Sequence, residues 1–350
     1  MDELQHYDYE LPAELIARQP PQAREDARLL VVDRQTGGFS DHSIRDLPEL
    51  LRPADCLVLN DTQVIPARLL GYRTATGGKW EGLFLEAAAD GTWLLLSQTR
   101  GKLRIDEQLT VVAADAGQSS LQLTVIGRTD DGSLVVRPET GETDHLILLG
   151  RVGTVPLPPY VGREKPTDLD WQRYQTTFAS RPGAIAAPTA GLHFTPQLLQ
   201  ACAQRGISQT CVTLHVGVGT FRSINTERLE EHSMHSEWCE LTSATVETIG
   251  EARDRGGRIV AIGTTSVRTL ESAVQDGMLQ PFRGPTELFI RPPYKFEAVD
   301  SLLTNFHLPR TTLLVLVSAF AGRELIRSAY EHAIRERYRF YSYGDAMLIL

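Results

Sequence analysis

The pattern of hydrophobic and polar positions divides the chain into three stretches. Near the N-terminus, apolar runs at 28–33 and 56–59 predict two buried strands, and residues 46–51 and 11–18 predict short helices. From about residue 64 the pattern changes to short β-rich runs. Beyond residue 156, apolar positions recur with helical spacing between further short strands.

The middle stretch predicts an antiparallel barrel. Its β-rich runs recur at short intervals and are separated by glycine turns such as Gly77-Gly78 and Asp131-Gly132. We therefore expect an α/β main domain, formed by residues 1–63 and 156–350, that carries an inserted small antiparallel β-barrel domain at 64–155. The expected barrel strands are 80–87, 92–97, 108–113, 120–126 and 133–137.

Strands and helices alternate in the last stretch, which is typical of an α/β layer. Thr195 is suited to the N-cap of a helix that has Pro196 at its first position, and Gly206 follows its apolar run. Residues 313–338 predict a helix broken near Gly322. The other expected helices are 168–178, 243–255 and 267–274, and the expected strands are 235–241, 258–262, 287–290 and 346–350.

Two histidines lie beside loops of small residues. His193 lies near the end of the stretch GAIAAPTAGLHFT, which also holds Thr189, and His215 precedes a glycine-rich turn. Small residues let a ligand approach the backbone closely, and histidine can exchange protons near neutral pH. Either ring can equally be a core histidine whose nitrogens are satisfied within the fold, and spacing alone does not decide between the two.

The strongest local signal for a binding site is a strand followed by a polar turn. The strand is predicted to end at Gly263, and Thr264 and Thr265 then offer hydroxyls and backbone N–H groups at the start of a helix, which favours an anion. Arg268 would lie in the first turn, where a cation is unfavourable unless an anion lies nearby. A bound carboxylate or phosphate explains this position, and the alternative is a surface pair between Arg268 and Glu271.

Other polar side chains follow predicted strands. Asn60 and Asp61 come directly after a buried strand, where α/β proteins bind ligands, although Asn-Asp is also common turn chemistry. His235, Glu237 and Cys239 would share one face of a strand, as metal ligands do. Their spacing matches no recognised ligand motif, so we expect no metal and favour acid or base work by Glu237 or His235.

Two polar turns lie near the C-terminus. Pro309 restricts the residue before it and predicts a turn that presents Asn305 and His307. Asp345 ends the polar and aromatic run YSYGD, just before the apolar tail. Each turn can contribute groups to a site, or its side chains can simply cap the turn.

Composition limits the classes of function. The 350 residues carry a formal net charge of −9, so contact with RNA needs a local basic patch, and the densest basic loop holds Arg100, Lys102 and Arg104. The four cysteines form no C-x-x-C pair, which argues against a zinc ribbon or an iron–sulfur cluster. No apolar run is long enough to span a membrane. We expect a cytoplasmic monomer.

Motifs in the same order along nearly the whole chain resemble one enzyme family. They begin with NDTQVIPARL at residue 60 and continue with APTAGLHFT, TLHVGVGTF, GTTSVRTLES, TNFHLP and YSYGDAMLIL. This series resembles the S-adenosylmethionine:tRNA ribosyltransferase-isomerase family of the queuosine pathway. The chain departs from the family pattern at Gln63, Val218, Pro293 and Arg310-Thr311.

The resemblance implies transfer and isomerisation of the ribosyl group of S-adenosylmethionine onto 7-aminomethyl-7-deazaguanine, the wobble base of a tRNA with a GUN anticodon. The products would be epoxyqueuosine-tRNA, adenine and methionine. S-adenosylmethionine would be a consumed substrate, and no bound cofactor is expected. The candidate catalytic residues are His193, His215, Glu237 and Asp345; the candidate substrate-binding residues are Asn60, Asp61, Thr189, Gly263, Thr264, Thr265 and Arg268; and Arg100, Lys102 and Arg104 are the candidates for tRNA.

Two other functions fit parts of the pattern. Another S-adenosylmethionine-dependent transferase, such as a methyltransferase, or a sugar-phosphate enzyme could use the turn at Gly263. A non-catalytic RNA-binding protein could be built on the barrel, although the acidic charge and the many loops of small residues speak against it. The reaction products distinguish these alternatives.

Overall fold

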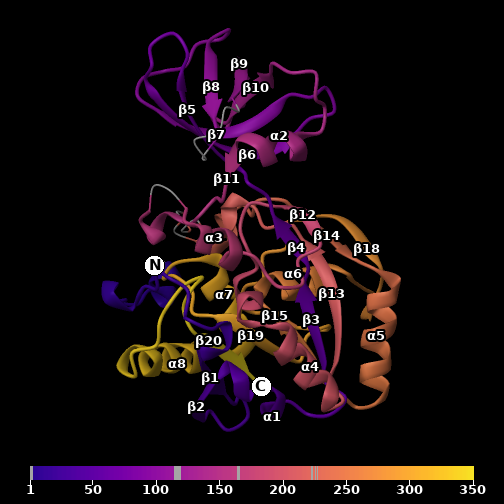
Figure 1. Cartoon of the computed structure of the whole chain (residues 1–350). Helices are drawn as coiled ribbons and strands as arrows, with labels where there is room; N and C mark the ends of the chain where they lie inside the picture. The colour runs from indigo at the N-terminus through magenta and orange to yellow at the C-terminus, as the bar shows by residue number, and fades with distance from the viewer. Residues whose placement is uncertain (1–2, 114–119, 164–165, 222–223, 225, 227) are drawn as a thin grey trace.

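The main sheet has nine strands and lies between two layers of helices (Figure 1). The computed structural model describes all residues except 1–2, 114–119, 164–165, 222–223, 225 and 227. The strand order is β18-β14-β13-β3-β15-β19-β20-β1-β2, and the central strands β13, β3, β15 and β19 are parallel. The strands are β1 (Arg28–Val32), β2 (Phe39–Ser43), β3 (Cys56–Asn60), β13 (Ser208–Leu214), β14 (Glu237–Leu241), β15 (Ile259–Ile262), β18 (Phe282–Thr286), β19 (Ser301–Asn305) and β20 (Ala346–Ile349).

Alternate residues of the central strands supply two hydrophobic layers. In β3, Val58 packs in the layer that includes α5 to α8, whereas Leu57 and Leu59 belong to the layer that includes α1 and α4. Because both faces are covered, β3, β15 and β19 are buried along their whole length, and β3 and β15 read as largely apolar runs. The helices are α1 (Leu47–Leu50), α4 (Pro196–Gln204), α5 (Ser243–Asp254), α6 (Thr264–Ser272), α7 (Thr312–Ala321) and α8 (Arg323–Arg335).

A closed six-stranded antiparallel barrel lies beside the main sheet, at the top of Figure 1. Its sheet runs β5-β6-β7-β10-β9-β8, and a β5–β8 pairing closes it around a core that includes Trp80 and Trp93. Helix α2 (His145–Val152) contributes Leu149 to this core. The barrel strands are β5 (Arg68–Arg73), β6 (Lys79–Ala87), β7 (Trp93–Thr99), β8 (Gln108–Val112), β9 (Ser120–Arg128) and β10 (Leu134–Pro138), and β11 (Gly153–Thr154) pairs with β5.

The fold class predicted from the sequence, an α/β main part with an inserted antiparallel barrel, is confirmed. The five expected barrel strands match β6 to β10. The sixth barrel strand, β5, was not predicted, because Gly71 interrupts its apolar sequence. A Cβ atom at Gly71 would lie 2.1 Å from the Thr110 carbonyl oxygen, so this position needs glycine where β5 meets β8. Strands β5 to β11 all fall within residues 64–155, and we retain that domain division as a proposal.

Three expected elements differ from the structure. The strand expected at 287–290 is absent there, and the edge strand is β18 instead, hidden in the sequence by Gly284-Pro285. Pro285 is tolerated because β18 is the outermost strand. The helix expected at 168–178 covers only α3 (Asp168–Arg173), and residues 11–18 hold only a 3₁₀ turn, Ala13–Leu15.

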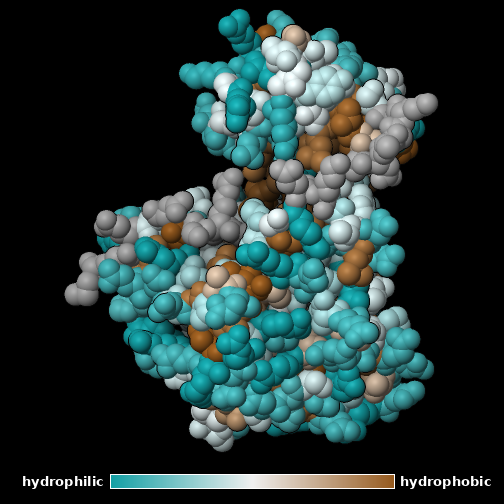
Figure 2. Space-filling view, turned by 60° about the vertical axis from the view of Figure 1, so that its left-hand side comes forward, coloured by the Kyte–Doolittle hydropathy of each residue, from teal (hydrophilic) through white to brown (hydrophobic). Residues whose placement is uncertain are grey.

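A largely apolar groove lies between the barrel and the main sheet, and Figure 2 shows hydrophobic residues on the surface at this junction. Its lining includes Leu83 and Leu96 from the barrel and Ile185 from the other side. Among the described helices, none is long and apolar enough to cross a membrane.

Candidate functional site

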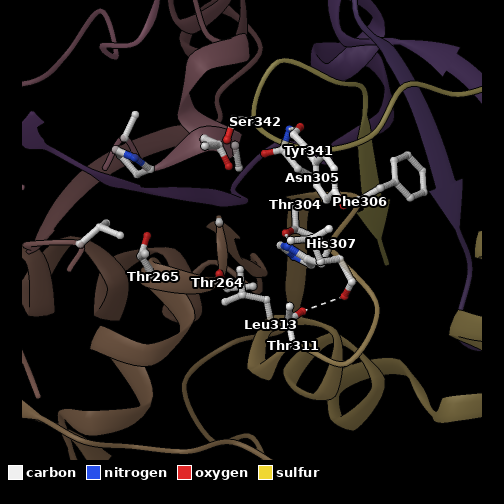
Figure 3. A pocket seen from close by; sticks show the side chains of 17 residues that line it. Thr264, Thr265, Thr304, Asn305, Phe306, His307, Thr311, Leu313, Tyr341 and Ser342 are labelled. Atoms are coloured by element: carbon white, nitrogen blue, oxygen red, sulfur yellow. Dashed lines mark hydrogen bonds between the residues drawn. The ribbon is translucent and has the colours of Figure 1, made fainter. Parts of the chain in front are cut away.

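A pocket opens at the carboxyl ends of the parallel strands β15 and β19. We call it the strand-end pocket (Figure 3). Parallel strands end at the same edge of a sheet, so the polar residues that follow them meet there. Figure 3 shows Thr264 and Thr265 on one side and Asn305 and Tyr341 on the other. The lining is Ala187, Pro188, Thr189, Ala190, Val216, Gly263, Thr264, Thr265, Thr304, Asn305, Phe306, His307, Leu308, Thr311, Leu313, Tyr341 and Ser342.

Four predicted substrate-binding residues line this pocket: Thr189, Gly263, Thr264 and Thr265. Gly263 caps α6 with φ +90° and ψ 154°, a conformation essentially restricted to glycine, and its N–H donates to the Leu303 carbonyl at 2.8 Å. This cap directs the first backbone N–H groups of α6 toward the pocket. The first N–H groups of a helix have no acceptor within the helix, and anion binding at this turn stays a prediction.

Asn60 fixes the strand ends beneath the pocket. Its amide nitrogen donates to the Leu214 carbonyl at 3.0 Å and to Thr265 Oγ1 at 3.1 Å, and its Oδ1 accepts from the backbone N–H groups of Leu214 and Thr62. Its side chain is therefore fully used in joining β3, β13 and α6. Asp61 lies further out, where its carboxylate accepts from Thr213 Oγ1 at 2.6 Å and Ser180 Oγ at 2.9 Å.

Arg268 pairs with Glu237, a residue that neither alternative from the sequence included. Helix α6 begins at Thr264, so Arg268 lies beyond its first turn, buried at 5% exposure. Its guanidinium pairs with Glu237 and also donates to the backbone carbonyl of Leu288 at 3.1 Å. Glu271 is buried as well and accepts the backbone N–H groups of the loop at 297–298. The surface pair between Arg268 and Glu271 does not form.

The Glu237–Arg268 pair lines a second, smaller cavity, which shares Leu313 with the strand-end pocket. Glu237 Oε1 accepts the Gly217 N–H at 2.8 Å, so the carboxylate also fixes the glycine-rich turn after His215. His235 lines the same cavity. No group of three or more His, Cys, Asp or Glu side chains suited to a metal ion occurs in the part of the chain that the structure describes.

His193 and His215 occupy different environments. His193 is buried at 3% exposure, and its Nε2 lies 3.2 Å from Asn305 Nδ2. Burial lowers the pKa of His193 to about 4. His215 lies between Gly183 and the Trp238 ring, which stacks on it at 5.1 Å, and its Nδ1 is 2.8 Å from Thr62 Oγ1.

Neither His193 nor His215 lines the strand-end pocket. The neighbour of His215, Val216, does line it, and successive residues of an extended segment face opposite sides, so the His215 ring is directed away. Partial burial also lowers the pKa of His215. His193 reaches the pocket through Asn305, which is a lining residue.

Asp345 is buried, and its carboxylate fixes the segment before the C-terminal strand. Oδ1 accepts the Arg28 backbone N–H at 3.0 Å and the Arg339 side chain at 3.1 Å, and Oδ2 accepts the Arg339 backbone N–H at 2.7 Å. These bonds tie β1 and β20 together. The catalytic assignment of Asp345 remains a prediction.

The basic loop at the end of β7 is exposed. Arg100, Lys102 and Arg104 are all exposed, and the carbonyls of the first two accept hydrogen bonds from the Arg73 side chain at 3.1 and 3.4 Å. Their backbone is thus held in place while their side chains face solvent.

The site residues predicted from the sequence omit most of the pocket wall that follows β19. Thr304, Asn305, His307 and Tyr341 line the pocket, whereas Asp345 is the one predicted catalytic residue from these C-terminal turns. The sequence did contain a signal for these pocket residues, because polar residues directly follow a short apolar run and Pro309 restricts the turn that holds them. His307 is buried, its Nε2 lies 2.8 Å from Thr304 Oγ1, and burial lowers its pKa to about 3.

Comparison with known proteins assigns the family. The family model described as "Queuosine biosynthesis protein" matches residues 4–349. This chain belongs to the queuosine biosynthesis protein family. It is 50% identical over 349 residues to the S-adenosylmethionine:tRNA ribosyltransferase-isomerase of Moorella thermoacetica, covering 99% of both chains, and 48% identical to the Symbiobacterium thermophilum protein of the same name, also over 99% of each.

A solved structure agrees with the family assignment. The crystal structure of the S-adenosylmethionine tRNA ribosyltransferase from Thermotoga maritima is 36% identical in sequence. The match covers 99% of this chain and 100% of that one, with a TM-score of 0.56. This solved structure and this chain thus share an overall fold.

Proposed function

We propose that this chain is an S-adenosylmethionine:tRNA ribosyltransferase-isomerase. It transfers and isomerises the ribosyl group of S-adenosylmethionine onto 7-aminomethyl-7-deazaguanine at the wobble position of tRNA, and releases adenine and methionine. The observation that carries this proposal beyond family membership is the strand-end pocket, where residues from five separate family motifs converge. S-adenosylmethionine is consumed in this reaction, so we propose no resident cofactor.

The strand-end pocket is the proposed site for S-adenosylmethionine. The methionine carboxylate would lie against the N-terminus of α6, where Gly263, Thr264 and Thr265 present N–H and hydroxyl groups. Thr189 lines the pocket from another loop, and the partly buried side chains of Leu313 and Tyr341 supply apolar surface for the adenine. This mixture of a few polar groups with apolar walls is typical of small-molecule pockets.

Arg268 remains a proposed partner of the methionine carboxylate. Because Glu237 already binds its guanidinium, this role is best tested with the neutral double variant Glu237→Gln/Arg268→Met, which avoids leaving one buried charge alone. If Arg268 holds the carboxylate, the dissociation constant for S-adenosylmethionine should rise by about 10-fold or more. An unchanged constant would leave the N-terminus of α6 as the carboxylate site.

The reaction needs a base, because the positive sulfonium acidifies the C5′ protons of the ribose and one of them must be removed. His193, His215, Glu237 and Asp345 remain the proposed candidates for proton transfer. Glu237 lies in the cavity that adjoins the strand-end pocket, which makes it the best placed of the four. Loss of solvent deuterium exchange at C5′ in a folded Glu237→Gln or His215→Ala variant would assign the base to that residue, and exchange retained in both would leave His193 or Asp345.

The second substrate is proposed to be a tRNA with a GUN anticodon. The exposed side chains of Arg100, Lys102 and Arg104 would contact its phosphates. We further propose that the protein acts as a monomer in the cytoplasm.

The function is tested by incubating the chain with S-adenosylmethionine and tRNA that carries 7-aminomethyl-7-deazaguanine. We expect mass spectrometry to detect epoxyqueuosine in the tRNA, with equal amounts of adenine and methionine. Formation of S-adenosylhomocysteine would indicate a methyltransferase instead, and tRNA binding without any product would indicate an RNA-binding protein.

A pair of threonine variants ties the reaction to the strand-end pocket. Thr264→Leu introduces an apolar side chain into the pocket and should abolish turnover. Thr248→Leu makes the same chemical change on α5, outside the pocket, and should retain turnover. Equal activity in the two variants would contradict this location of the site.

A further inference from the structure

Asn305 carries a buried oxygen atom without a hydrogen-bond partner in the strand-end pocket. The residue is 2% exposed, and its Oδ1 accepts no hydrogen bond from any described residue. A buried carbonyl oxygen in a folded protein is normally paired, because leaving it unpaired loses the hydrogen bonds that water gave it in the unfolded chain. Since Asn305 lines the pocket, a ligand can supply the missing donor.

The surrounding backbone settles which end of the Asn305 amide is the free one. Nδ2 lies 3.3 Å from the carbonyl oxygen of Tyr341 and 3.4 Å from that of Asp345. Turning the amide over would bring its oxygen against two carbonyl oxygens, neither of which can donate. Tyr341 has φ +74°, an unusual conformation for a bulky residue, and in this conformation its carbonyl accepts from the amide. The free atom is therefore the oxygen.

His193 accepts a further hydrogen bond from the amide nitrogen of Asn305. Its Nε2 lies 3.2 Å from Nδ2, and because Nδ2 can only donate, Nε2 must be the unprotonated ring nitrogen. Burial keeps the ring neutral at physiological pH, since it lowers the pKa to about 4. The lone pair that a general base would use is thus engaged with Asn305.

We propose that Asn305 Oδ1 recognises an uncharged N–H or O–H donor on the adenosyl part of S-adenosylmethionine, and that His193 positions this amide. The inference rests on the proposed function and adds to that function a residue that determines substrate specificity. A ligand that lacks the donor leaves the buried oxygen unpaired, so the site rejects it more strongly than an apolar contact would. His193 acts through Asn305 and is a positioning residue.

Substrate analogues identify the donor. Isothermal calorimetry would compare S-adenosylmethionine with three analogues that lack, in turn, the 6-amino group of adenine, the 2′-hydroxyl and the 3′-hydroxyl. For the wild-type chain we expect one analogue to bind about 10-fold or more weakly. In Asn305→Ala the dissociation constant of the same analogue should lie within about 3-fold of that of S-adenosylmethionine. The control variant Gln98→Ala truncates an exposed amide of the barrel and should keep the wild-type ratio of the two dissociation constants.

Two results would overturn the role of Asn305. One is a wild-type chain that binds all three analogues as well as S-adenosylmethionine, and this measurement does not depend on how any variant folds. The other is an Asn305→Ala variant that retains the full discrimination. If the wild-type chain binds no S-adenosylmethionine and forms no epoxyqueuosine, the proposed function itself fails, which is a distinguishable outcome.

Paired substitutions of His193 test its positioning role. Glutamine can still accept a hydrogen bond from Asn305 Nδ2, whereas leucine cannot. We expect His193→Leu to lose the discrimination between analogues and His193→Gln to recover most of it, with C5′ exchange still present in His193→Gln. If both variants discriminate like the wild-type chain, or if both lose C5′ exchange, His193 does not act through Asn305.

Discussion

Two histidines in this protein are buried in their neutral form. The pKa of His193 is lowered to about 4 and that of His307 to about 3, in both cases by burial. Unfolded histidine binds a proton near pH 6.5. As the pH falls from about 6.5 toward 4, the unfolded chain gains protons that the folded chain does not bind, so the free energy of unfolding must decrease.

The first prediction concerns this pH dependence. At pH 5, each buried neutral histidine should reduce the free energy of unfolding by about 2 kcal/mol relative to pH 7.5. His307→Gln should therefore flatten the dependence between these two values, as measured by urea unfolding. His6→Gln changes an exposed histidine and provides the comparison. A His307→Gln variant with the same pH dependence as the wild-type chain would contradict burial in the neutral form.

A second prediction at the scale of the residue concerns Glu237. Its carboxylate pairs with buried Arg268, so Glu237→Gln leaves a buried charge uncompensated and should lower the free energy of unfolding by about 3 kcal/mol or more. Glu240 lies on the same strand and pairs with the exposed Arg181, so Glu240→Gln should cost less than about 1 kcal/mol. Equal costs in urea unfolding would show that the Glu237–Arg268 pair contributes little.

At the scale of the element, the junction between β15 and α6 determines the floor of the strand-end pocket. Gly263 is its critical residue, because φ +90° with ψ 154° is strained for any residue with a Cβ atom. A Cβ atom there would meet its nearest neighbours, the Ala190 and Thr265 side chains, at 3.5 and 3.6 Å, so space is not the limitation. The backbone conformation alone makes glycine necessary.

The third prediction follows from this junction. Gly263→Ala should lower the free energy of unfolding by about 2 kcal/mol and weaken S-adenosylmethionine binding, because relaxing the strain moves the first N–H groups of α6. Gly250→Ala inside α5 has no neighbour within 4 Å and should raise the free energy of unfolding by about 0.5 to 1 kcal/mol. Thermal unfolding with calorimetric titration separates the two effects, and unchanged binding in Gly263→Ala would remove α6 from the site.

At the scale of the whole molecule, a protein with a formal net charge of −9 must bind tRNA through a local cationic surface. The barrel loop and helix α8 both carry three basic residues, but they differ in their partners. Arg323, Arg327 and Arg335 on α8 each lie beside a glutamate, at 3.0 to 3.4 Å. The three basic side chains of the barrel loop are exposed, which makes that loop the better phosphate contact.

The fourth prediction compares these two surfaces. Replacing Arg100, Lys102 and Arg104 together by alanine should weaken tRNA binding and reduce the slope of log K against log salt concentration by about 2 to 3. Replacing the three α8 arginines should change the slope by less than about 1. Fluorescence anisotropy over a salt series measures both, and the reverse order would place the tRNA on α8.

The local sequence pattern determined many of the strands and helix ends of this protein. Apolar runs predicted β1, β3, β15 and β20 because strands covered on both faces carry hydrophobic residues continuously. The N-cap at Thr195 and the break at Gly322 were readable because each depends on neighbouring residues only. The strand-to-helix turn after β15 was predictable for the same reason, since a strand, a glycine and two threonines specify it within a few positions.

Tertiary structure decided which side chains meet. The sequence offered Glu271 or a ligand as the partner of Arg268, yet the partner is Glu237, 31 residues away on a neighbouring strand. His193 reads as a base beside a flexible loop, whereas the fold buries it against Asn305, 112 residues away. Strand β5 was hidden by the glycine that barrel closure requires. Capping and periodicity are local, but partners, burial and close approach depend on segments that only folding brings together.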